Sequence, residues 1–236
     1  MAQMTEAKER KNDRRPRVGL MVPSSNTVME LDFNRELSRE YDVHTARMYM
    51  VETTRAAEIS MVETYAPEAA RDLGTLNPDL VVFGCTSAGS LFGTAYDADV
   101  CDKLSAIARA PTLGVLTAVG QQLDALPGQR LAVITPYVED LTNSVARAAQ
   151  SATRHVVRAA GMGISDNVRL CEPTPEEIVD FSRTNLTGID FDLLLVSCTN
   201  FRALEAQPML EREFGVPVVT SNSAVIASIR QLLHTL

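Results

Sequence analysis

Short apolar runs alternate with stretches of helical spacing along the chain from Arg17 onward. We expect the apolar runs to be strands, and several are continuously apolar, as the buried strands of a parallel sheet are. The expected strands are Arg17–Val22, Val43–Met50, Leu80–Gly84, Leu131–Thr135, Leu193–Ser197 and Val216–Val219. The expected helices are Thr27–Ser38, Ala56–Leu76, Asp97–Ala108, Val138–Ser151, Pro175–Asn185, Ala203–Phe214 and Ser223–Leu233. This alternation predicts a doubly wound α/β fold, in which parallel sheets carry helices on both faces.

An internal repeat relates the first half of the chain to the second. The segment Arg17–Pro23 (RVGLMVP) matches Arg130–Pro136 (RLAVITP), and Asp79–Thr86 (DLVVFGCT) matches Asp192–Thr199 (DLLLVSCT). Both matches have the same spacing, because 130 minus 17 and 198 minus 85 are each 113. Unrelated strands would rarely keep one spacing while also aligning Pro with Pro and Cys-Thr with Cys-Thr. The repeat therefore indicates two pseudo-symmetric halves.

The repeat also predicts the domain organisation. We expect a first α/β half at residues 17–126 and a second at 130–236, with the turn Pro127–Gly128 between them. Their last strands begin at Pro111 and Pro217, and this spacing is 217 minus 111, or 106, so the second half is seven residues shorter there. Parallel sheets bind ligands at the carboxyl ends of their strands. Two such halves therefore predict an active-site cleft between them.

Composition and charge exclude several classes of function. The net charge is -8 with a pI near 5.0, and the residues that we expect to fold contain no cluster of Lys and Arg. We therefore expect no nucleic-acid partner. Apolar runs of about six residues are far shorter than the roughly 20 that cross a bilayer, so we expect no membrane partner. Residues 1–16 are charged rather than apolar, which predicts a disordered leader and a cytoplasmic protein.

Two of the four cysteines form a matched pair. Cys85 and Cys198 each follow a predicted strand and enter a turn, where the N-terminus of a helix would favour the thiolate. Cys101 and Cys171 have no counterpart in the repeat, and we expect both to be ordinary buried cysteines. No spacing of Cys and His is typical of a disulfide scaffold or of zinc, so no metal is predicted.

Two sulfurs on opposite faces of a small planar substrate fit two kinds of chemistry. One thiolate can remove a proton while the other thiol delivers one, or one sulfur can add to a carbon while the other group handles protons. Neither route requires a metal or an organic cofactor. The candidate binding groups for a substrate carboxylate are the hydroxyl and amide side chains beside the cysteines, namely Thr86, Ser87, Thr199 and Asn200.

The polar run Pro23–Thr27 predicts the start of a helix. Thr27 is the expected N-cap, and Glu30 would complete a capping box with it. A capped N-terminus still has free N–H groups that can bind an anion. Ser25 and Asn26 are therefore further candidates to bind a substrate carboxylate.

Loops and histidines add little to this site. The loops Thr86–Tyr96 and Gly161–Pro175 contain glycine, and we expect them to close over the site. The three histidines are His44 in a strand, His155 near a helix end and His234 in the tail. None of them repeats or neighbours a cysteine in the sequence, so no Cys-His pair is predicted.

Several segments together resemble a known family. They are Val22–Thr27 (VPSSNT) followed by Met29–Glu30, Thr135–Tyr137 (TPY), Asp166–Asn167, and a Cys after the third strand of each half. As a set they resemble the maleate cis-trans isomerases of the aspartate/glutamate racemase superfamily, which also contains arylmalonate decarboxylases and hydantoin racemases. The resemblance extends over essentially the whole chain from Arg17 onward.

The resemblance implies a role for each site residue. Cys85 would add to the double bond of maleate as the nucleophile, and Cys198 would be the opposing acid and base. The residues that would hold the substrate carboxylates are Asn26, Tyr137 and Asn167. Addition of sulfur converts the double bond into a single bond, rotation follows, and elimination releases fumarate. The implied enzyme is an isomerase that acts on a small carboxylic acid without a cofactor.

One departure leaves other reactions open. The first turn, Cys85–Ser90 (CTSAGS), is closer to the hydroxyl-rich turn of the decarboxylases and amino-acid racemases, and Ser197–Phe201 (SCTNF) resembles the racemase pattern. A racemase, epimerase or decarboxylase that uses Cys85 and Cys198 as opposed acid and base is therefore the alternative. A non-catalytic small-acid sensor is a third hypothesis, although binding alone does not need two thiols. We also expect a homo-oligomer, since apolar helix faces of α/β folds often pair.

Overall fold

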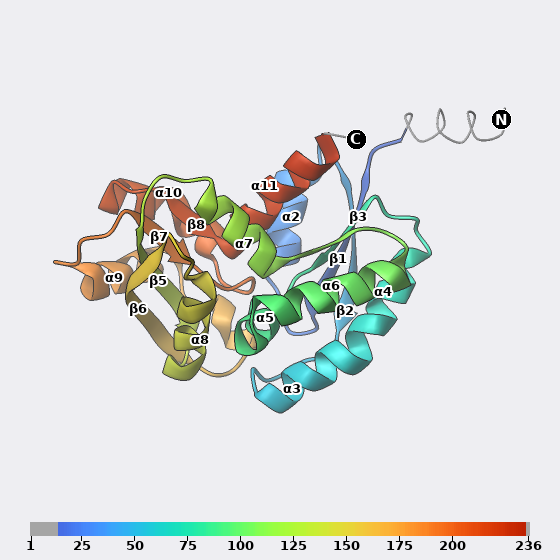
Figure 1. Cartoon of the computed structure of the whole chain (residues 1–236), viewed down its shortest axis with the longest axis horizontal. Coiled ribbons are helices and arrows are strands. Elements are labelled where there is room, and N and C mark those ends of the chain that lie inside the picture. The colour runs from blue at the N-terminus through green and yellow to red at the C-terminus, as the bar shows by residue number, and fades with distance from the viewer. Residues whose placement is uncertain (1–13, 235–236) are drawn as a thin grey trace.

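The computed structural model describes residues 14–234 and contains two sheets of four parallel strands each (Figure 1). The first sheet has the order β2-β1-β3-β4 and consists of β1 (Arg17–Pro23), β2 (Asp42–Met48), β3 (Leu80–Phe83) and β4 (Thr112–Gly114). The second has the order β6-β5-β7-β8 and consists of β5 (Arg130–Tyr137), β6 (His155–Ile164), β7 (Leu193–Val196) and β8 (Val218–Thr220). The predicted α/β architecture is confirmed. The predicted leader, residues 1–16, lies almost wholly outside the described residues.

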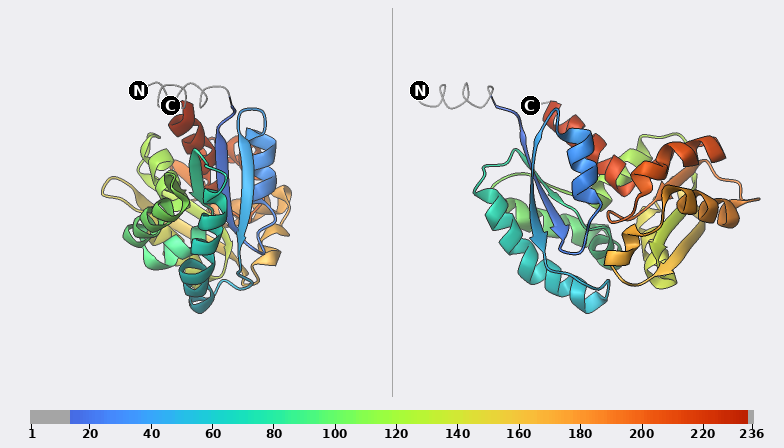
Figure 2. Two further views of the ribbon diagram at one scale, coloured as in Figure 1. Left: turned by 90° about the vertical axis from the view of Figure 1, so that its right-hand side faces the viewer. Right: turned by 180° about the vertical axis from the view of Figure 1, so that it is seen from behind.

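Helices connect the strands and lie on both faces of the sheets (Figure 2). The first half contains α2 (Met29–Leu37), α3 (Arg55–Ser60), the π-helical segment η1 (Met61–Tyr65), α4 (Ala66–Gly74), α5 (Thr86–Phe92), α6 (Thr94–Ala108) and α7 (Val115–Asp124). The second half contains α8 (Glu139–Ala149), the 3-10 turn η2 (Val168–Cys171), α9 (Pro175–Leu186), α10 (Ala203–Phe214) and α11 (Ser221–His234). Within residues 14–234, no helix has the length and apolar character needed to cross a membrane.

The strand register confirms the internal repeat. Val18 of β1 pairs with Leu80 of β3, and 113 residues later Leu131 of β5 pairs with Leu193 of β7. The two sheets also have the same strand order when β1 to β4 are matched with β5 to β8. The two halves therefore place the ends of their third strands, which precede the matched cysteines, at equivalent points.

Helices α7 and α11 pack together between the two sheets (Figure 1). Each begins directly after the last strand of its half, at Val115 and Ser221, so the spacing of 106 residues continues into the helices. Their buried apolar residues are Val115, Ala118, Val119, Leu123, Ala224, Val225, Ile226, Ile229 and Leu233. One hydrophobic cluster includes these residues together with residues of both sheets. The two halves thus share a core, which fixes their strand ends relative to each other.

The apolar pattern does not predict β6, α5 or α7. β6 (HVVRAAGMGI) is a partly exposed edge strand whose small residues and Arg158 interrupt the apolar run. His155 begins this strand and does not lie near a helix end as expected. Helix α5 occupies most of the predicted loop Thr86–Tyr96, although its Gly and Ser residues are weak helix formers. The expectation that this segment is a loop that closes over the site is therefore wrong.

The start of α2 differs from the predicted capping box. The helix begins at Met29, and the Asn26 side chain, not that of Thr27, accepts hydrogen bonds from the backbone N–H groups of Val28 at 3.1 Å and Met29 at 3.0 Å. Glu30 forms an ion pair with Arg47 and does not reach back to the cap. Asn is as good an N-cap as Thr, and here it lies one residue earlier.

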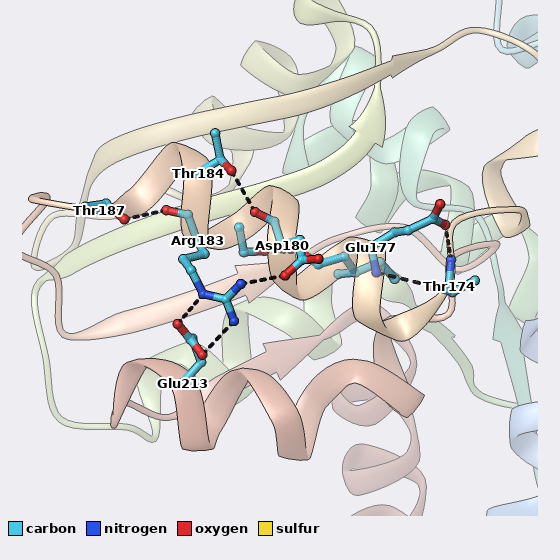
Figure 3. A network of polar contacts seen from close by, with 9 residues as sticks. Thr174, Glu177, Asp180, Arg183, Thr184, Thr187 and Glu213 are labelled. Carbon is cyan, nitrogen blue, oxygen red and sulfur yellow. Dashed lines mark hydrogen bonds and ion pairs between the residues drawn. The ribbon is translucent and has the colours of Figure 1, made fainter.

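A polar network fixes the outer helices of the second half (Figure 3). Thr174 and Glu177 form a capping box at the start of α9, with bonds of 3.2 and 2.8 Å. Arg183 on α9 pairs with both carboxylate oxygens of Glu213 on α10, at 2.6 and 2.9 Å, and also with Asp180. Such exposed pairs contribute about 1 kcal/mol or less, so they orient α9 and α10 more than they stabilise the fold.

One buried carboxyl group outside the cysteine region is poorly satisfied. Asp97 on α6 is 1% exposed, and within residues 14–234 neither of its oxygens has a hydrogen-bond partner. A Cβ at Gly114 would lie 2.3 Å from this carboxylate, so glycine is required at the end of β4. Burial raises the pKa of Asp97 to about 6.

Asp97→Asn should alter the pH dependence of stability. The pKa of Asp97 is higher in the folded protein than in the unfolded chain, so its ionisation destabilises the fold increasingly as the pH rises from about 4 to above 6. The free energy of unfolding of the variant, relative to wild type, should therefore increase by about 2 kcal/mol between pH 4 and pH 7. Urea unfolding at both pH values measures this difference. Asp102→Asn, on the exposed face of α6, is the control and should show no comparable change.

Candidate active site

The two repeat cysteines lie at the carboxyl ends of equivalent strands. Cys85 follows β3 and is the N-cap residue of α5, and Cys198 follows β7. Both residues are only 2% exposed. The turns that carry them touch, because the Thr199 hydroxyl beside Cys198 donates a hydrogen bond to the Gly84 carbonyl beside Cys85 at 3.2 Å. The structure therefore brings the two halves together at one buried site.

A buried carboxyl group lies against the first cysteine. Glu58 on α3 is 0% exposed, and the Cys85 thiol donates to its Oε2 atom at 3.6 Å. The Ser87 hydroxyl lies 3.4 Å from the Cys85 sulfur and donates to the other oxygen of Glu58. Burial raises the pKa of Glu58 to about 7, and the hydrogen bonds from Ser87 and Cys85 oppose the rise. Cys85, Ser87 and Glu58 thus form one hydrogen-bonded cluster.

The second cysteine has a different set of partners. The backbone N–H of Asn200 donates to the Cys198 sulfur at 3.3 Å, and the Tyr137 hydroxyl is hydrogen-bonded to the same sulfur. Burial raises the pKa of Cys198 to about 12, while both hydrogen bonds oppose that rise. Burial, followed by the charges of Cys198, Cys85 and Glu58, raises the pKa of Tyr137 well above its usual range. Tyr137 is therefore within electrostatic reach of both cysteines.

Burial sets the thiol pKa values and outweighs the backbone N–H groups near each sulfur, at the N-terminus of α5 for Cys85 and in the turn before α10 for Cys198. Desolvation, followed by the charge of Glu58, raises the pKa of Cys85 well above its usual range. The expectation that a helix N-terminus would favour the thiolate is therefore wrong for the resting protein. At neutral pH both Cys85 and Cys198 are thiols, so a reaction at either sulfur must include removal of its proton.

A first chain of polar contacts joins the halves beside the cysteines. The Asn26 amide donates to the Thr199 hydroxyl at 3.1 Å, and both side chains are buried. Asn222 donates to the Thr199 carbonyl at 3.3 Å and to the Asp32 carboxylate at 2.8 Å. Two of the predicted binding residues, Asn26 and Thr199, thus lie in direct contact.

A second chain of contacts connects the remaining predicted amides. The Thr27 backbone N–H donates to the Asn200 side chain at 2.8 Å, and Asn200 donates to the Asn167 carbonyl at 2.6 Å. The Asn167 amide in turn donates to the Ser25 hydroxyl at 2.5 Å. Ser25 and Thr27 come from the first half and the two asparagines from the second. The structure therefore brings together Ser25, Asn167 and Asn200, as we expect for residues near the carboxyl ends of parallel strands.

Thr86 lies in a separate cluster of hydroxyl groups. Its Oγ1 atom donates to the Ser221 hydroxyl at 3.3 Å, and Ser221 is also 3.3 Å from the Ser197 hydroxyl. All three residues are buried. Ser221 is the first residue of α11, so the N-terminus of this helix also contributes to the site.

The sequence prediction missed Glu58 and Ser221. Glu58 is a lone carboxylate on the apolar face of the predicted helix Ala56–Leu76, three and four residues before the buried Met61 and Val62. Such a residue at helical spacing is a detectable signal of a buried functional carboxyl group. Ser221 gave no comparable signal, because the start of α11 was expected two residues later.

The other cysteines and the histidines form none of these hydrogen bonds, although the charge of Cys171 contributes to the raised pKa of Cys198. Cys101 is buried, as expected, but Cys171 is partly exposed, because it ends the surface turn η2, where its thiol donates to the Val168 carbonyl at 3.1 Å. The expectation that Cys171 is buried is therefore wrong. His234 contacts Tyr41 and Glu40. Within the part of the chain that the structure describes, no group of three or more His, Cys, Asp or Glu residues is arranged to hold a metal ion.

The fold and the site together define the class of protein. It is an α/β protein of two similar halves, and each half contributes one buried cysteine to the site between them. A family model described as arylmalonate decarboxylase matches residues 18–235. The chain therefore belongs to the arylmalonate decarboxylase family. It is also 24% identical over 232 residues to a maleate isomerase from Geobacillus stearothermophilus, with 92% of each chain covered. These findings confirm the resemblance on which the sequence prediction relied.

Solved structures have the same fold. A maleate isomerase variant from Pseudomonas putida, determined with maleate, superimposes with a TM-score of 0.87 at 24% identity, covering 94% of this chain and 93% of that one. A Cys-to-Ser variant of the Nocardia farcinica maleate cis-trans isomerase, with a covalently bound succinylcysteine intermediate, has a TM-score of 0.84 at 24% identity and covers 94% of each chain. At this level of identity the two structures support the fold.

Proposed function

We propose that the protein is a cofactor-independent isomerase that converts maleate, or a close analogue, into fumarate through a thioether adduct on Cys85. The observation that carries this proposal is the pair of buried thiols at equivalent strand ends, in contact through their neighbouring residues Gly84 and Thr199. Similar proteins named maleate isomerases, one of them with a succinylcysteine intermediate, support the assignment.

The proposed reaction balances with the groups of this chain alone. The Cys85 sulfur forms a bond to one alkene carbon as its thiol proton passes to the hydrogen-bonded cluster around it, which returns the proton on elimination, and the π electrons move to the other carbon, next to a carboxylate. Cys198 delivers a proton to that carbon, which leaves a single bond that can rotate. Cys198 then removes the proton, the carbon–sulfur bond breaks, and the trans acid is released.

We assign the substrate carboxylates to the polar chains that join the halves. Asn26, Tyr137 and Asn167 are the proposed primary binding residues, and Ser25, Thr86, Ser87, Thr199 and Asn200 are further candidates. The Asn26 and Asn167 amides donate to the hydroxyls of Thr199 and Ser25. A bound carboxylate is a stronger acceptor than a hydroxyl and would receive these bonds in their place.

Proton NMR tests the proposed function directly. The folded protein, incubated with maleate, should produce fumarate without any added cofactor. An absence of fumarate, from a preparation whose thiols are reduced and whose fold is intact, would contradict the proposal.

The second candidate is a racemase, epimerase or decarboxylase with the same two cysteines as opposed acid and base. The hydroxyls of Thr86 and Ser87 at the start of α5 favour it, because they repeat the hydroxyl-rich turn of those enzymes. It predicts deuterium exchange at the carbon next to a carboxylate in D2O, or release of CO2 from phenylmalonate. Either result without fumarate production would replace the isomerase proposal.

Tyr137→Phe should slow the reaction without unfolding the protein. The Tyr137 hydroxyl is hydrogen-bonded to Cys198 and lowers the pKa of that thiol against the effect of burial. Its loss should reduce kcat by about tenfold to a hundredfold, as expected for one hydrogen bond to a reacting group. Steady-state kinetics with maleate measure the effect, and thermal unfolding checks the fold. An unchanged kcat would mean that the Tyr137 hydroxyl takes no part in the reaction.

We also infer that the chain divides into halves at 17–126 and 130–236, as the internal repeat indicates. A homo-oligomer is expected because apolar side chains such as Leu31 and Tyr49 are 61% and 60% exposed. Light scattering coupled to size-exclusion chromatography would test the oligomeric state.

A further inference from the structure

The two halves differ in the ionisable side chain that accompanies each cysteine. Cys85 has the Glu58 carboxylate within hydrogen-bond distance, whereas Cys198 has the Tyr137 hydroxyl. The residue 113 positions after Glu58, where the repeat would place its counterpart, is Cys171, whose thiol donates to a backbone carbonyl. The two halves thus have similar backbones, but the side chain that could exchange a proton with the cysteine differs between them.

We propose that Glu58 is the catalytic base that removes the Cys85 proton as the sulfur attacks, and that returns it when the carbon–sulfur bond breaks. Glu58 thereby makes Cys85, rather than Cys198, the nucleophile. This assignment rests on the proposed two-cysteine function and adds to it the group that activates the nucleophile.

The contacts of Glu58 fit this role. One of its oxygens accepts from the Cys85 thiol at 3.6 Å, and the other accepts from Ser87, which holds the carboxylate in place. Thr54 caps α3 by accepting from the Ala57 N–H at 3.3 Å, and the π-helical segment η1 follows this short helix directly. Short π-helical segments are often found at functional sites, where they redirect a side chain. Ser87 is thus a positioning residue for Glu58.

The proton inventory is balanced by this assignment. The thiol proton moves to the Glu58 carboxylate while the sulfur lone pair forms the bond to carbon, so the Cys85–Glu58 pair changes from one negative charge to none. The adduct carboxylates then face a neutral acid instead of a buried anion. On elimination the leaving thiolate recovers its proton from Glu58. Cys198 separately supplies and removes the proton on the second carbon.

The electrostatic surroundings predict the direction of the pH dependence. The titratable groups around Glu58 are Cys85 on its own side and Tyr137 and Cys198 from the second half. Burial raises the pKa of Glu58 to about 7, and the hydrogen bonds from Ser87 and Cys85 oppose this rise. A base must be ionised to act, so kcat/KM should fall as the pH decreases below about 7.

Glu58→Gln tests the assignment in two independent ways. The variant should lower kcat by about a hundredfold or more, change KM little, and lose the acidic limb of the pH profile. Alkylation of Cys85 by iodoacetamide at pH 7, followed by peptide mass spectrometry, requires no substrate and should also become slower. If Glu58 acted only through its negative charge, Glu58→Gln would instead lower the pKa of Cys85 and accelerate alkylation.

Matched variants keep the result decisive. Glu63→Gln changes an exposed carboxylate on the adjacent segment η1 and should behave like wild type. Glu58→Asp keeps the charge and should recover part of the lost rate. If Glu58→Gln does not fold, Ser87→Ala takes its place and should also slow alkylation. Equal or faster alkylation with unchanged turnover overturns the role of Glu58. Slower alkylation in a protein that does not isomerise maleate instead overturns the proposed function and leaves Glu58 as the base of Cys85.

Discussion

Cys85→Ser is expected to abolish the isomerisation of maleate, with kcat/KM at least about a thousandfold below wild type. The hydroxyl keeps the size of the side chain and a hydrogen bond to Glu58 but is a far weaker nucleophile than sulfur. Without the thioether adduct the double bond cannot become a single bond, so rotation is blocked. Proton NMR of maleate and fumarate measures the loss.

A matched control separates loss of the nucleophile from loss of the fold. Cys101→Ser replaces another buried thiol of the same half, outside the site, and should retain activity close to wild type. Thermal unfolding of both variants verifies that they are folded. Substantial fumarate production by folded Cys85→Ser would exclude covalent catalysis at this residue.

Cys198→Ser is expected to trap the adduct. Addition at Cys85 places one proton on the neighbouring carbon, which the residue 198 hydroxyl or water can deliver, but removal of that proton needs a base, and serine is a much weaker base than the Cys198 thiolate. The variant should therefore gain the mass of one maleic acid molecule on Cys85 and release fumarate at least about a hundredfold more slowly than wild type. Intact-protein and peptide mass spectrometry detect the adduct.

The double variant Cys85→Ser with Cys198→Ser provides the control for this experiment and should remain unmodified. A mass gain only at a residue other than Cys85 would contradict the assignment of Cys85 as the nucleophile. A fully active Cys198→Ser would leave the buried contact between Cys198 and Tyr137 without a function in the reaction.

Most of the architecture was predictable because a repeat constrains a sequence more strongly than local propensity does. Matching Arg17–Pro23 with Arg130–Pro136 located β1 and β5 as equivalent strands of the two halves. The missed elements lack that signal. β6 is an edge strand rich in small residues, and α7 follows β4 without an intervening turn, so neither has a distinct apolar period.

The sequence predicted where the candidate site lies but not the pKa values of its side chains. The matched turns identified Cys85 and Cys198, and the polar residues near them do meet across the halves. The thiol pKa values could not be predicted, because desolvation depends on how completely the shared core encloses the site. The helical spacing of Glu58 indicates that it is buried, but its contact with Cys85 could not be predicted, because Glu58 lies on a helix 27 residues earlier in the chain.

In the proposed mechanism both cysteines act on the same bond of one small acid. A crystal structure of Cys198→Ser soaked with maleate measures this most directly. We predict a covalent bond from the Cys85 sulfur to one carbon of the former double bond, with the residue 198 hydroxyl within about 4 Å of the adjacent carbon, on the opposite face. A ligand bound with only one of the two side chains within reach, or a site in which the residues at 85 and 198 face separate cavities, would contradict the proposed mechanism.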